Sequence, residues 1–293
     1  MGSLIATCLK FLGFFLSLFP RPVVRFMGSL IGVLWFDILR FRRQMIIDNI
    51  AIAFPEMPLD ERIRIGRSSM YRLGAHSLEF FTLPYLDQKW LKKHVVFHGL
   101  EHLEKARLKD KGVLVLGMHM GSGDLTASTV VMAGYPMHII SKFFGIKWLN
   151  DIWFGIRGSQ GVKFIEPHGE KTAFEILRAV KAKSDVAFVI DQFMGRPFAV
   201  ENFFFGRKTG TAKGLALFVL KTGSPVVPLY AYEEAGKAHI VFQEELDLQR
   251  FIAQDKEQAV VEMTQHFNHV LESIIRKHPM DWMWIHRRWK EYE

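Results

Sequence analysis

Residues 113–124 read VLVLGMHMGSGD, and this stretch is the most informative in the chain. Its first four residues are all apolar, which predicts a buried strand. The glycines that follow end the strand, and residues 123–133 then have a composition suited to a helix. We therefore expect a strand that ends in a loop carrying His119, with a helix beginning directly after the loop.

The same alternation of apolar runs and helical segments continues toward the C-terminus. The predicted strands are residues 113–116, 137–141, 162–165, 186–190, 226–230 and 239–242. The predicted helices are residues 59–83, 123–133, 148–156, 171–182 and 211–221. Strands that alternate with helices favour βαβ units, so we predict an α/β protein with a mainly parallel central sheet flanked by helices. Ligands bind such sheets at the carboxyl ends of the strands.

The N-terminal part of the chain is apolar and differs from the rest. Residues 3–19 contain one charged residue. As a helix they would span about 25 Å, which is short for a hydrocarbon core of about 30 Å. Residues 26–41 are also apolar, and three arginines lie at or just after their end. We predict membrane-associated helices in residues 1–43 and the main domain in residues 44–293. The alternative is that both apolar segments are buried core helices.

Composition and charge also favour a membrane surface. The chain of 293 residues is 49% hydrophobic, contains 26 Phe and carries a net charge of +8. Apolar and basic residues together are typical of proteins that bind anionic membranes, whereas a nucleic-acid binder keeps its apolar residues inside. The single cysteine, Cys8, excludes an internal disulfide and a thiolate zinc site, and therefore favours a reducing compartment.

His119 is the first candidate for catalysis. A histidine at a strand end can accept a proton from a hydroxyl near neutral pH, and Asp124 is a candidate to hold its other ring nitrogen. Gly121 and Gly123 allow backbone N–H groups to face a ligand, and the start of the helix favours negative charge. A histidine that only caps a turn is the alternative, because a His and an acid five residues apart also occur by chance.

These residues belong to a wider pattern that resembles the lysophospholipid acyltransferase superfamily and, within it, the bacterial lipid A late acyltransferases. The signature of the superfamily is a His, four residues and an acid, here His119 and Asp124. The other matching segments are NIAIAFP (49–55), RGSQG (157–161), DQ (191–192), FFFG (203–206) with Thr211, GSPVVP (223–228) and HPMDWMWIHRRWK (278–290). Lipid A enzymes usually carry Glu at the position of Asp124, so the resemblance indicates the chemistry more firmly than the acceptor.

The resemblance implies an O-acyltransferase, with residues 44–293 as the acyltransferase domain. It would transfer a fatty acyl chain from an acyl carrier protein or coenzyme A thioester to a hydroxyl of a phosphorylated lipid, with a lipid A precursor as the favoured acceptor. The thioester is a co-substrate, and we expect no cofactor, no metal and no nucleic acid. We expect the protein on the anionic cytoplasmic face of the inner membrane.

The resemblance also implies roles for individual residues. His119 would be the general base and Asp124 would orient it. Arg157 suits bidentate recognition of the acceptor phosphate, with Lys163 as a second candidate. Asp191 and Gln192 end a predicted strand and should lie on the same rim of the sheet as His119. The full set of expected substrate-binding residues is Gly121, Ser122, Arg157, Lys163, Asp191 and Gln192.

Three alternatives remain open. The acceptor could be another lysolipid or an aminolipid. A metal-dependent phosphoesterase would instead use His119, Asp124 and Asp191 as ligands. A membrane or nucleic-acid binder without catalytic activity is the third.

Four other features have structural interpretations. The phenylalanines of 203–205 indicate a packed loop more than an acyl-chain wall, and residues 209–211 suggest an N-cap for the next helix. His94, His98 and His102 are spaced like metal ligands on a helix, but residues 95–97 favour a strand, so we interpret them as structural. The aromatic and basic residues of 282–290 indicate an interfacial belt or packing against the site entrance.

Overall fold

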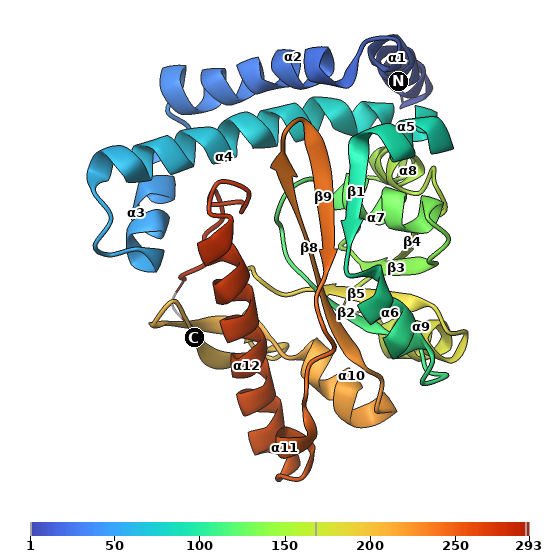
Figure 1. The fold of residues 1–293 in the computed structure, drawn as a ribbon, viewed down its shortest axis with the longest axis vertical. Coiled ribbons are helices and arrows are strands. Elements are labelled where there is room, and N and C mark those ends of the chain that lie inside the picture. Colours follow the sequence, from blue (N-terminus) through green and yellow to red (C-terminus); the bar gives the residue numbers. More distant parts are fainter. Residues whose placement is uncertain (1, 168, 291, 293) are drawn as a thin grey trace.

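The computed structural model describes residues 2–167, 169–290 and 292. Its centre is a seven-stranded sheet with the strand order β1-β9-β8-β2-β5-β3-β4 (Figure 1). The strands are β1 (Val95–His98), β2 (Leu114–Gly117), β3 (Met137–Ile140), β4 (Lys163–Ile165), β5 (Asp185–Val189), β8 (Val226–Glu234) and β9 (Lys237–Phe242). Neighbouring strands are parallel except for the antiparallel pair β8 and β9. The mainly parallel α/β fold is therefore confirmed.

Helices cover both faces of this sheet. They are α5 (Gln88–His94), α6 (Leu100–Arg107), α7 (Gly123–Met132), α8 (Lys147–Arg157), α9 (Thr172–Lys181), α10 (Gly214–Thr222), α11 (Gln249–Ile252) and α12 (Lys256–Lys277). Side chains of β2 alternate between the faces, as the strand period of two requires. Leu114 and Leu116 pack in a core with α9, α10 and α12, whereas Val113 and Val115 pack in a second core with α6 and α7.

A two-stranded hairpin was not predicted from the sequence. It consists of β6 (Ala199–Phe204) and β7 (Arg207–Ala212). The predicted N-cap at residues 209–211 is wrong, because these residues lie in β7 and α10 begins only at Gly214. Thr209 and Thr211 are fully buried and form hydrogen bonds with Arg288, which is distant in sequence. Local helix signals could not reveal that partner.

Two of the three phenylalanines of 203–205 are packed, as expected, whereas Phe203 is 47% exposed and lies with Phe204 in β6 and not in a loop. Phe204 and Phe205 are buried, and Phe204 contacts the rings of Trp282 and Trp289. The three histidines are separated, also as expected. His94 ends α5, His98 ends β1 and His102 lies in α6. They do not share a helix face.

The apolar N-terminal segments form helices that pack on the rest of the protein. They are α1 (Gly2–Ser17), α2 (Arg21–Val33) and the π-helix η1 (Leu34–Ile38), followed by α3 (Arg43–Ala53), α4 (Leu59–Glu79) and the 3-10 helix η2 (Phe80–Tyr85). Glycines allow α2 to lie very close to α4. A Cβ atom at Gly32 would be 2.4 Å from the carbonyl oxygen of Met70. Any larger residue at this contact would force the two helices apart.

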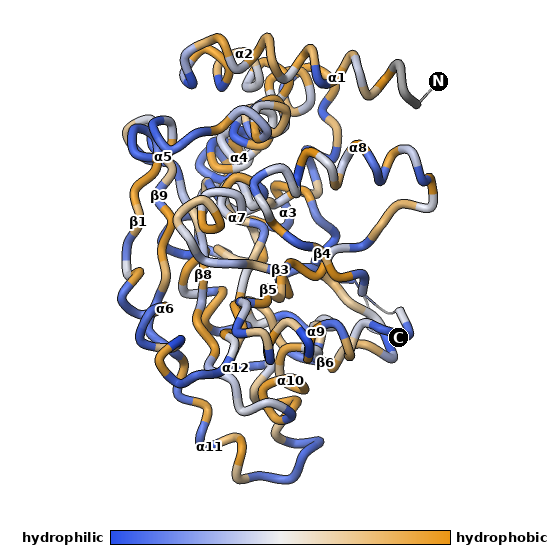
Figure 2. Tube along the Cα trace, turned by 90° about the vertical axis from the view of Figure 1, so that its right-hand side faces the viewer, coloured by the Kyte–Doolittle hydropathy of each residue, from blue (hydrophilic) through white to orange (hydrophobic). Residues whose placement is uncertain are grey.

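One face of α1 and α2 remains exposed and apolar. Figures 1 and 2 show both helices at one end of the molecule, and Figure 2 colours much of α1 as hydrophobic. Phe11 and Phe26 are 69% and 65% exposed. Within the described part of the chain, a single helix of sufficient length and hydropathy to cross a membrane is not found. The segments Arg21–Ile38 and Arg43–Ala53 meet that criterion only together, with a bend of 90° between them.

Candidate active site

The loop after β2 is held by the C-terminal segment. Met120 forms an isolated antiparallel bridge with Trp282. The carbonyl of His119 accepts from the N–H of Met283 at 3.0 Å, and Gly121 donates its N–H to the carbonyl of Asp281 at 2.9 Å. Residues near 282 therefore act as a short extra strand that fixes the position of His119.

Parallel pairing of β2 with β5 brings His119 and Asp191 together. Gly117 pairs with Val189, and each of the two functional residues lies two positions further along its chain. The Nδ1 of His119 lies 2.8 Å from Oδ1 of Asp191, and the backbone N–H of His119 donates to Oδ2 at 3.0 Å. Trp282 also donates its indole N–H to Oδ2, at 2.7 Å. The prediction that these residues share one rim of the sheet is confirmed.

The charges of this pair are mutually dependent. Burial disfavours the charged imidazolium, but the charge of Asp191 and its hydrogen bond outweigh burial, so the pKa of His119 is raised above 6.5. Burial alone would raise the pKa of Asp191. The charge of His119 and the hydrogen bonds from His119 and Trp282 instead lower it to about 2. Asp191 is therefore a carboxylate that stabilises positive charge on His119.

Gln192 connects His119 to a second histidine. Its Nε2 lies 2.9 Å from Nε2 of His119 and 2.7 Å from Nε2 of His286. The two imidazole rings have centroids 5.3 Å apart. Burial and the charge of His119 lower the pKa of His286 to about 4, so His286 is neutral at pH 7. Sequence reasoning placed Gln192 in the site but missed His286.

The expected role of Asp124 as the orienter of His119 is wrong in this structure. Asp191 occupies Nδ1 of His119, and Oδ1 of Asp124 instead accepts from Nε of Arg157 at 2.6 Å. Arg157 also donates to the hydroxyl of Ser141 at 2.8 Å, and its guanidinium lies over the rings of Phe154 and Phe164. The spacing of residues along the chain could not reveal that Asp124 forms its ion pair with Arg157, which is distant in sequence.

We expect the Asp124–Arg157 pair to contribute to stability as a unit. Asp124→Asn and Arg157→Ala should each lower the free energy of unfolding, because each leaves a half-buried partner unpaired. The double variant should lose less than the sum, with a coupling of about 0.5–3 kcal/mol in urea unfolding of the full chain. Additivity within about 0.3 kcal/mol would show that the two side chains do not interact.

Of the two loop glycines, Gly121 does not act as expected. The N–H of Gly121 is engaged by Asp281 and does not face a ligand. The φ of +62° and the proximity of Ala231, whose carbonyl oxygen would lie 2.8 Å from a Cβ, explain why glycine stands there. Ser122 is the N-cap of α7, and its carbonyl accepts from the N–H and hydroxyl of Thr126. The first N–H groups of α7, beginning at the exposed Gly123, remain the candidates for contact with an anion.

Lys163 does not lie at this rim. It is the first residue of β4, at the amino end of a strand that runs parallel to β3 and β5. It lines a separate cavity of about 750 Å³ together with His138 and Arg178. Its expected role as a second phosphate ligand beside His119 is therefore not supported. The predicted strand, residues 162–165, also has Lys163 near its amino end, so the strand pattern itself did not point to this role.

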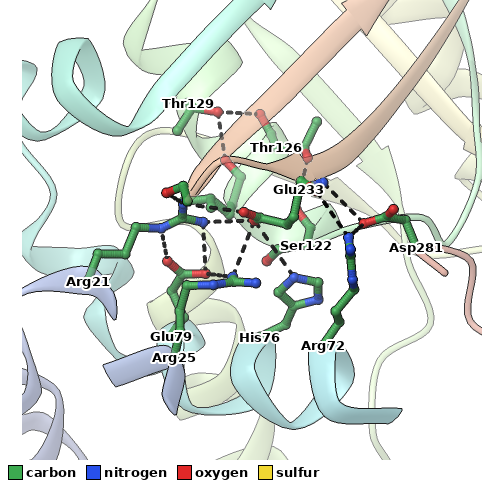
Figure 3. Close-up of polar contacts among 12 residues, drawn as sticks. Arg21, Arg25, Arg72, His76, Glu79, Ser122, Thr126, Thr129, Glu233 and Asp281 are labelled. Carbon is green, nitrogen blue, oxygen red and sulfur yellow. Dashed lines mark hydrogen bonds and ion pairs between the residues drawn. The ribbon is translucent and has the colours of Figure 1, made fainter. Parts of the chain in front are cut away.

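A buried charge network contacts the C-terminal segment that holds this loop (Figure 3). Arg21 of α2 is almost fully buried and pairs with Glu79 of α4 and Glu233 of β8. The N–H of Glu233 and the side chain of Arg72 both donate to Asp281. Because the carbonyl of Asp281 accepts from the N–H of Gly121, the N-terminal helices are connected to the loop that carries His119. No sequence pattern indicated this network.

The tryptophans near the C-terminus pack inside the protein. Trp282 and Trp284 are each 1% exposed, and Arg288 is fully buried. Packing against the site is thus confirmed for this segment, and an interfacial belt of these two tryptophans is wrong. Among the described residues, no group of three or more His, Cys, Asp and Glu side chains is placed to hold a metal ion.

The protein is thus a mainly parallel α/β protein in which a histidine, hydrogen-bonded to a carboxylate, lies at the carboxyl ends of the central strands. Comparison with known families gives the particular family. The family described as bacterial lipid A biosynthesis acyltransferase matches residues 4–291, and the chain belongs to this family. The resemblance identified from the sequence motifs is confirmed.

Three relatives illustrate the range of the similarity. The lipid A biosynthesis palmitoleoyltransferase of Escherichia coli is 24% identical over 278 residues, covering 92% of this chain and 86% of the relative. The lipid A biosynthesis lauroyltransferase of the same organism is 22% identical over 275 residues, with the same coverage. The phosphatidylinositol mannoside acyltransferase of Mycolicibacterium smegmatis is 22% identical over 243 residues, covering 82% of this chain and 77% of the relative.

Proposed function

We propose that this protein transfers a fatty acyl chain from an acyl thioester to a hydroxyl of a phosphorylated lipid, with a lipid A precursor as the favoured acceptor. The observation that carries the proposal is the hydrogen bond between Nδ1 of His119 and the buried Asp191. It leaves Nε2 of His119 as the nitrogen that can accept a proton. Membership of the acyltransferase family supports the reaction type.

In the proposed reaction, the acceptor hydroxyl attacks the thioester directly. The acceptor hydroxyl gives its proton to Nε2 of His119, and its oxygen attacks the carbonyl carbon of the thioester. The carbon–sulfur bond then breaks, and the leaving thiolate takes the proton from the imidazolium. Gln192 must first move away from Nε2 of His119, because its amide occupies that position. A thioester is already activated, so no enzyme nucleophile is required.

Asp124 and Arg157 have a supporting role in this proposal. Asp124 lies in the first turn of α7, and its charge contributes to the raised pKa of His119. Two nitrogens of Arg157 are engaged by Asp124 and Ser141. A phosphate at Arg157 would have to compete with Asp124, so phosphate binding there stays a prediction. We propose that the pair fixes the start of α7 beside the reacting groups.

The donor and acceptor are proposed on different grounds. An acyl carrier protein or coenzyme A thioester would supply the acyl group, and the net charge of +8 favours an acidic carrier protein electrostatically. Two of the relatives above are named for lipid A biosynthesis, which favours a lipid A precursor. The relative named for phosphatidylinositol mannoside keeps another lipid acceptor as the second candidate.

We further propose that the exposed apolar face of α1 and α2 contacts an anionic membrane on its cytoplasmic side. Phe11, Leu18 and Phe26 are each at least 65% exposed, and burial of such side chains in lipid is favourable. Lys and Arg near an anionic leaflet add about 1 kcal/mol each. The active site would then receive its lipid acceptor from the same surface.

Flotation with anionic vesicles tests this membrane contact. Replacing Phe11, Leu18 and Phe26 together with asparagine should weaken binding at least 10-fold, because three apolar contacts are lost. Leu108→Asn is the matched control, since Leu108 is 85% exposed but lies after α6, outside the N-terminal face. Equal flotation of the triple variant and the wild type would contradict the membrane contact.

Purified protein tests the proposed reaction itself. The full chain is incubated with an acyl carrier protein thioester or a coenzyme A thioester and with either a lipid A precursor or a lysophospholipid. We expect one acceptor to gain one acyl chain, with release of one thiol per chain. Hydrolysis of the acceptor phosphate without acyl transfer would instead support the phosphoesterase alternative.

A further inference from the structure

A basic pocket lies beside the proposed catalytic base. Its volume is about 330 Å³. The residues that line it are Arg42, Gln192, Phe193, His286, Arg287 and Lys290. Three of them are basic residues, and none is a carboxylate. A pocket of this composition favours an anion.

Gln192 and His286 connect the pocket to the site. Both line the pocket, and the Nε2 of Gln192 lies 2.9 Å from Nε2 of His119. The imidazole rings of His119 and His286 have centroids 5.3 Å apart. A molecule that places one group in the pocket can therefore place another group at Nε2 of His119.

The pocket is built from two distant parts of the chain. Arg42 precedes α3, and its guanidinium donates to the carbonyl of Ile285 at 3.3 Å. Asn49 of α3 is buried and donates to the carbonyls of Trp284 and His286, at 2.7 and 2.8 Å. These contacts hold α3 against the C-terminal segment and set the distance between the cations.

Arg42 also has an unfavourable backbone conformation. Its φ is 53°, in the left-handed region that favours glycine or asparagine. The guanidinium lies over the ring of Phe41 and has no carboxylate partner among the described residues.

The cations of the pocket differ in their ion pairs from three other arginines of the chain. Within the described residues, Arg42, Arg287 and Lys290 form no ion pair with an acid, whereas Arg21, Arg72 and Arg157 each do. In the described part of the chain, their positive charges are therefore not neutralised by an ion pair. They are available to an anion, whereas Arg157 is paired with Asp124.

We propose that this pocket binds a phosphate ester group of a substrate and so positions that substrate against His119. The proposal rests on the proposed acyl transfer, in which both substrates carry phosphate esters. The lipid acceptor is phosphorylated, and the thioester donor carries its acyl chain on a phosphopantetheine arm. Guanidinium groups suit phosphate because their planar N–H pairs match two of its oxygens.

Binding of inorganic phosphate to the full chain tests the pocket without any catalytic step. Arg287→Ala and Lys290→Ala should each weaken phosphate binding about 10-fold or more in isothermal titration calorimetry, since each removes a charge-assisted contact. Arg207→Ala and Lys256→Ala are the matched controls, because both cations are exposed and lie outside the pocket. Equal affinity in all four variants would overturn the proposal.

Steady-state kinetics identifies which phosphate the pocket binds. The Arg287→Ala and Lys290→Ala variants are compared with the wild type on the phosphorylated acceptor and on the same acceptor without phosphate. They are also compared on an acyl carrier protein thioester and on an acyl N-acetylcysteamine thioester, which has no phosphate. If the variants are as active as the wild type on the phosphate-free acceptor, the pocket binds the lipid phosphate. If they are as active as the wild type with the phosphate-free thioester, the pocket binds the phosphate of the donor.

A defect that persists when both substrates lack phosphate would overturn the proposal, because the cations would then act without a phosphate. The two assays also separate this proposal from the proposed function. If the wild type transferred no acyl group but Arg287→Ala still lost phosphate binding, the acyl transfer would fail and the phosphate site would stand.

Discussion

His119→Ala is expected to lower kcat for acyl transfer by about 10²- to 10⁴-fold, the usual contribution of a general base. The alanine removes the nitrogen that accepts the hydroxyl proton and leaves Asp191 as a buried carboxylate without its imidazole partner. The KM of both substrates should change much less, because the imidazole acts mainly in the transition state. Steady-state assays of the purified full chain measure this effect.

The matched control for this variant is His269→Ala. His269 is exposed on α12, and its ring contacts Gln265. Its removal should leave kcat unchanged. Thermal unfolding of both variants shows whether the fold is retained. A folded His119→Ala protein with near-normal acyl transfer would refute the role of His119 as the base.

Asp191→Asn is expected to have the second largest effect, with kcat lowered roughly 10²-fold or more. Asparagine has the same shape but no charge, so the imidazolium that forms during proton transfer loses its main stabilising partner. The base must be neutral to act, and activity should therefore fall as pH falls through the raised pKa of His119. Without the charge of Asp191, burial and Arg157 both lower that pKa.

The acidic limb of the pH–activity profile should accordingly shift to lower pH in Asp191→Asn. Asp124→Asn provides the comparison, because Asp124 raises the pKa of His119 only through its charge, without a hydrogen bond. In Asp124→Asn the acidic limb should also shift to lower pH, but by less than in Asp191→Asn, and kcat should fall less than in Asp191→Asn. An acidic limb at the same pH in the wild type and Asp191→Asn would show that Asp191 does not control His119.

Strand ends could be predicted well because parallel pairing follows from local patterns. The apolar runs before His119 and Asp191 predict neighbouring strands, and parallel strands end on the same rim. This reasoning correctly placed the two residues together. The same reasoning does not place Lys163 at this rim, because Lys163 lies near the amino end of its strand both in the prediction and in the structure.

The partners of individual side chains could not be predicted in the same way. Asp124 follows His119 closely, so the sequence suggests a contact between them, but Arg157 reaches Asp124 from the end of α8. Trp282 reaches Asp191 from 91 residues further along the chain. The antiparallel bridge between Met120 and Trp282 involves single residues and has no sequence periodicity. Such contacts depend on tertiary packing, which local signals do not record.

Mass spectrometry of cellular lipids tests the central claim most directly. Lipids are extracted from matched cells that carry the wild-type protein, the folded His119→Ala variant or no copy of the protein. We predict that one phosphorylated lipid species is heavier by one acyl chain only with the wild type, and that His119→Ala matches the cells without the protein. The same lipid profile in all three, or equal acylation by His119→Ala and the wild type, would contradict an acyltransferase in which His119 is the base.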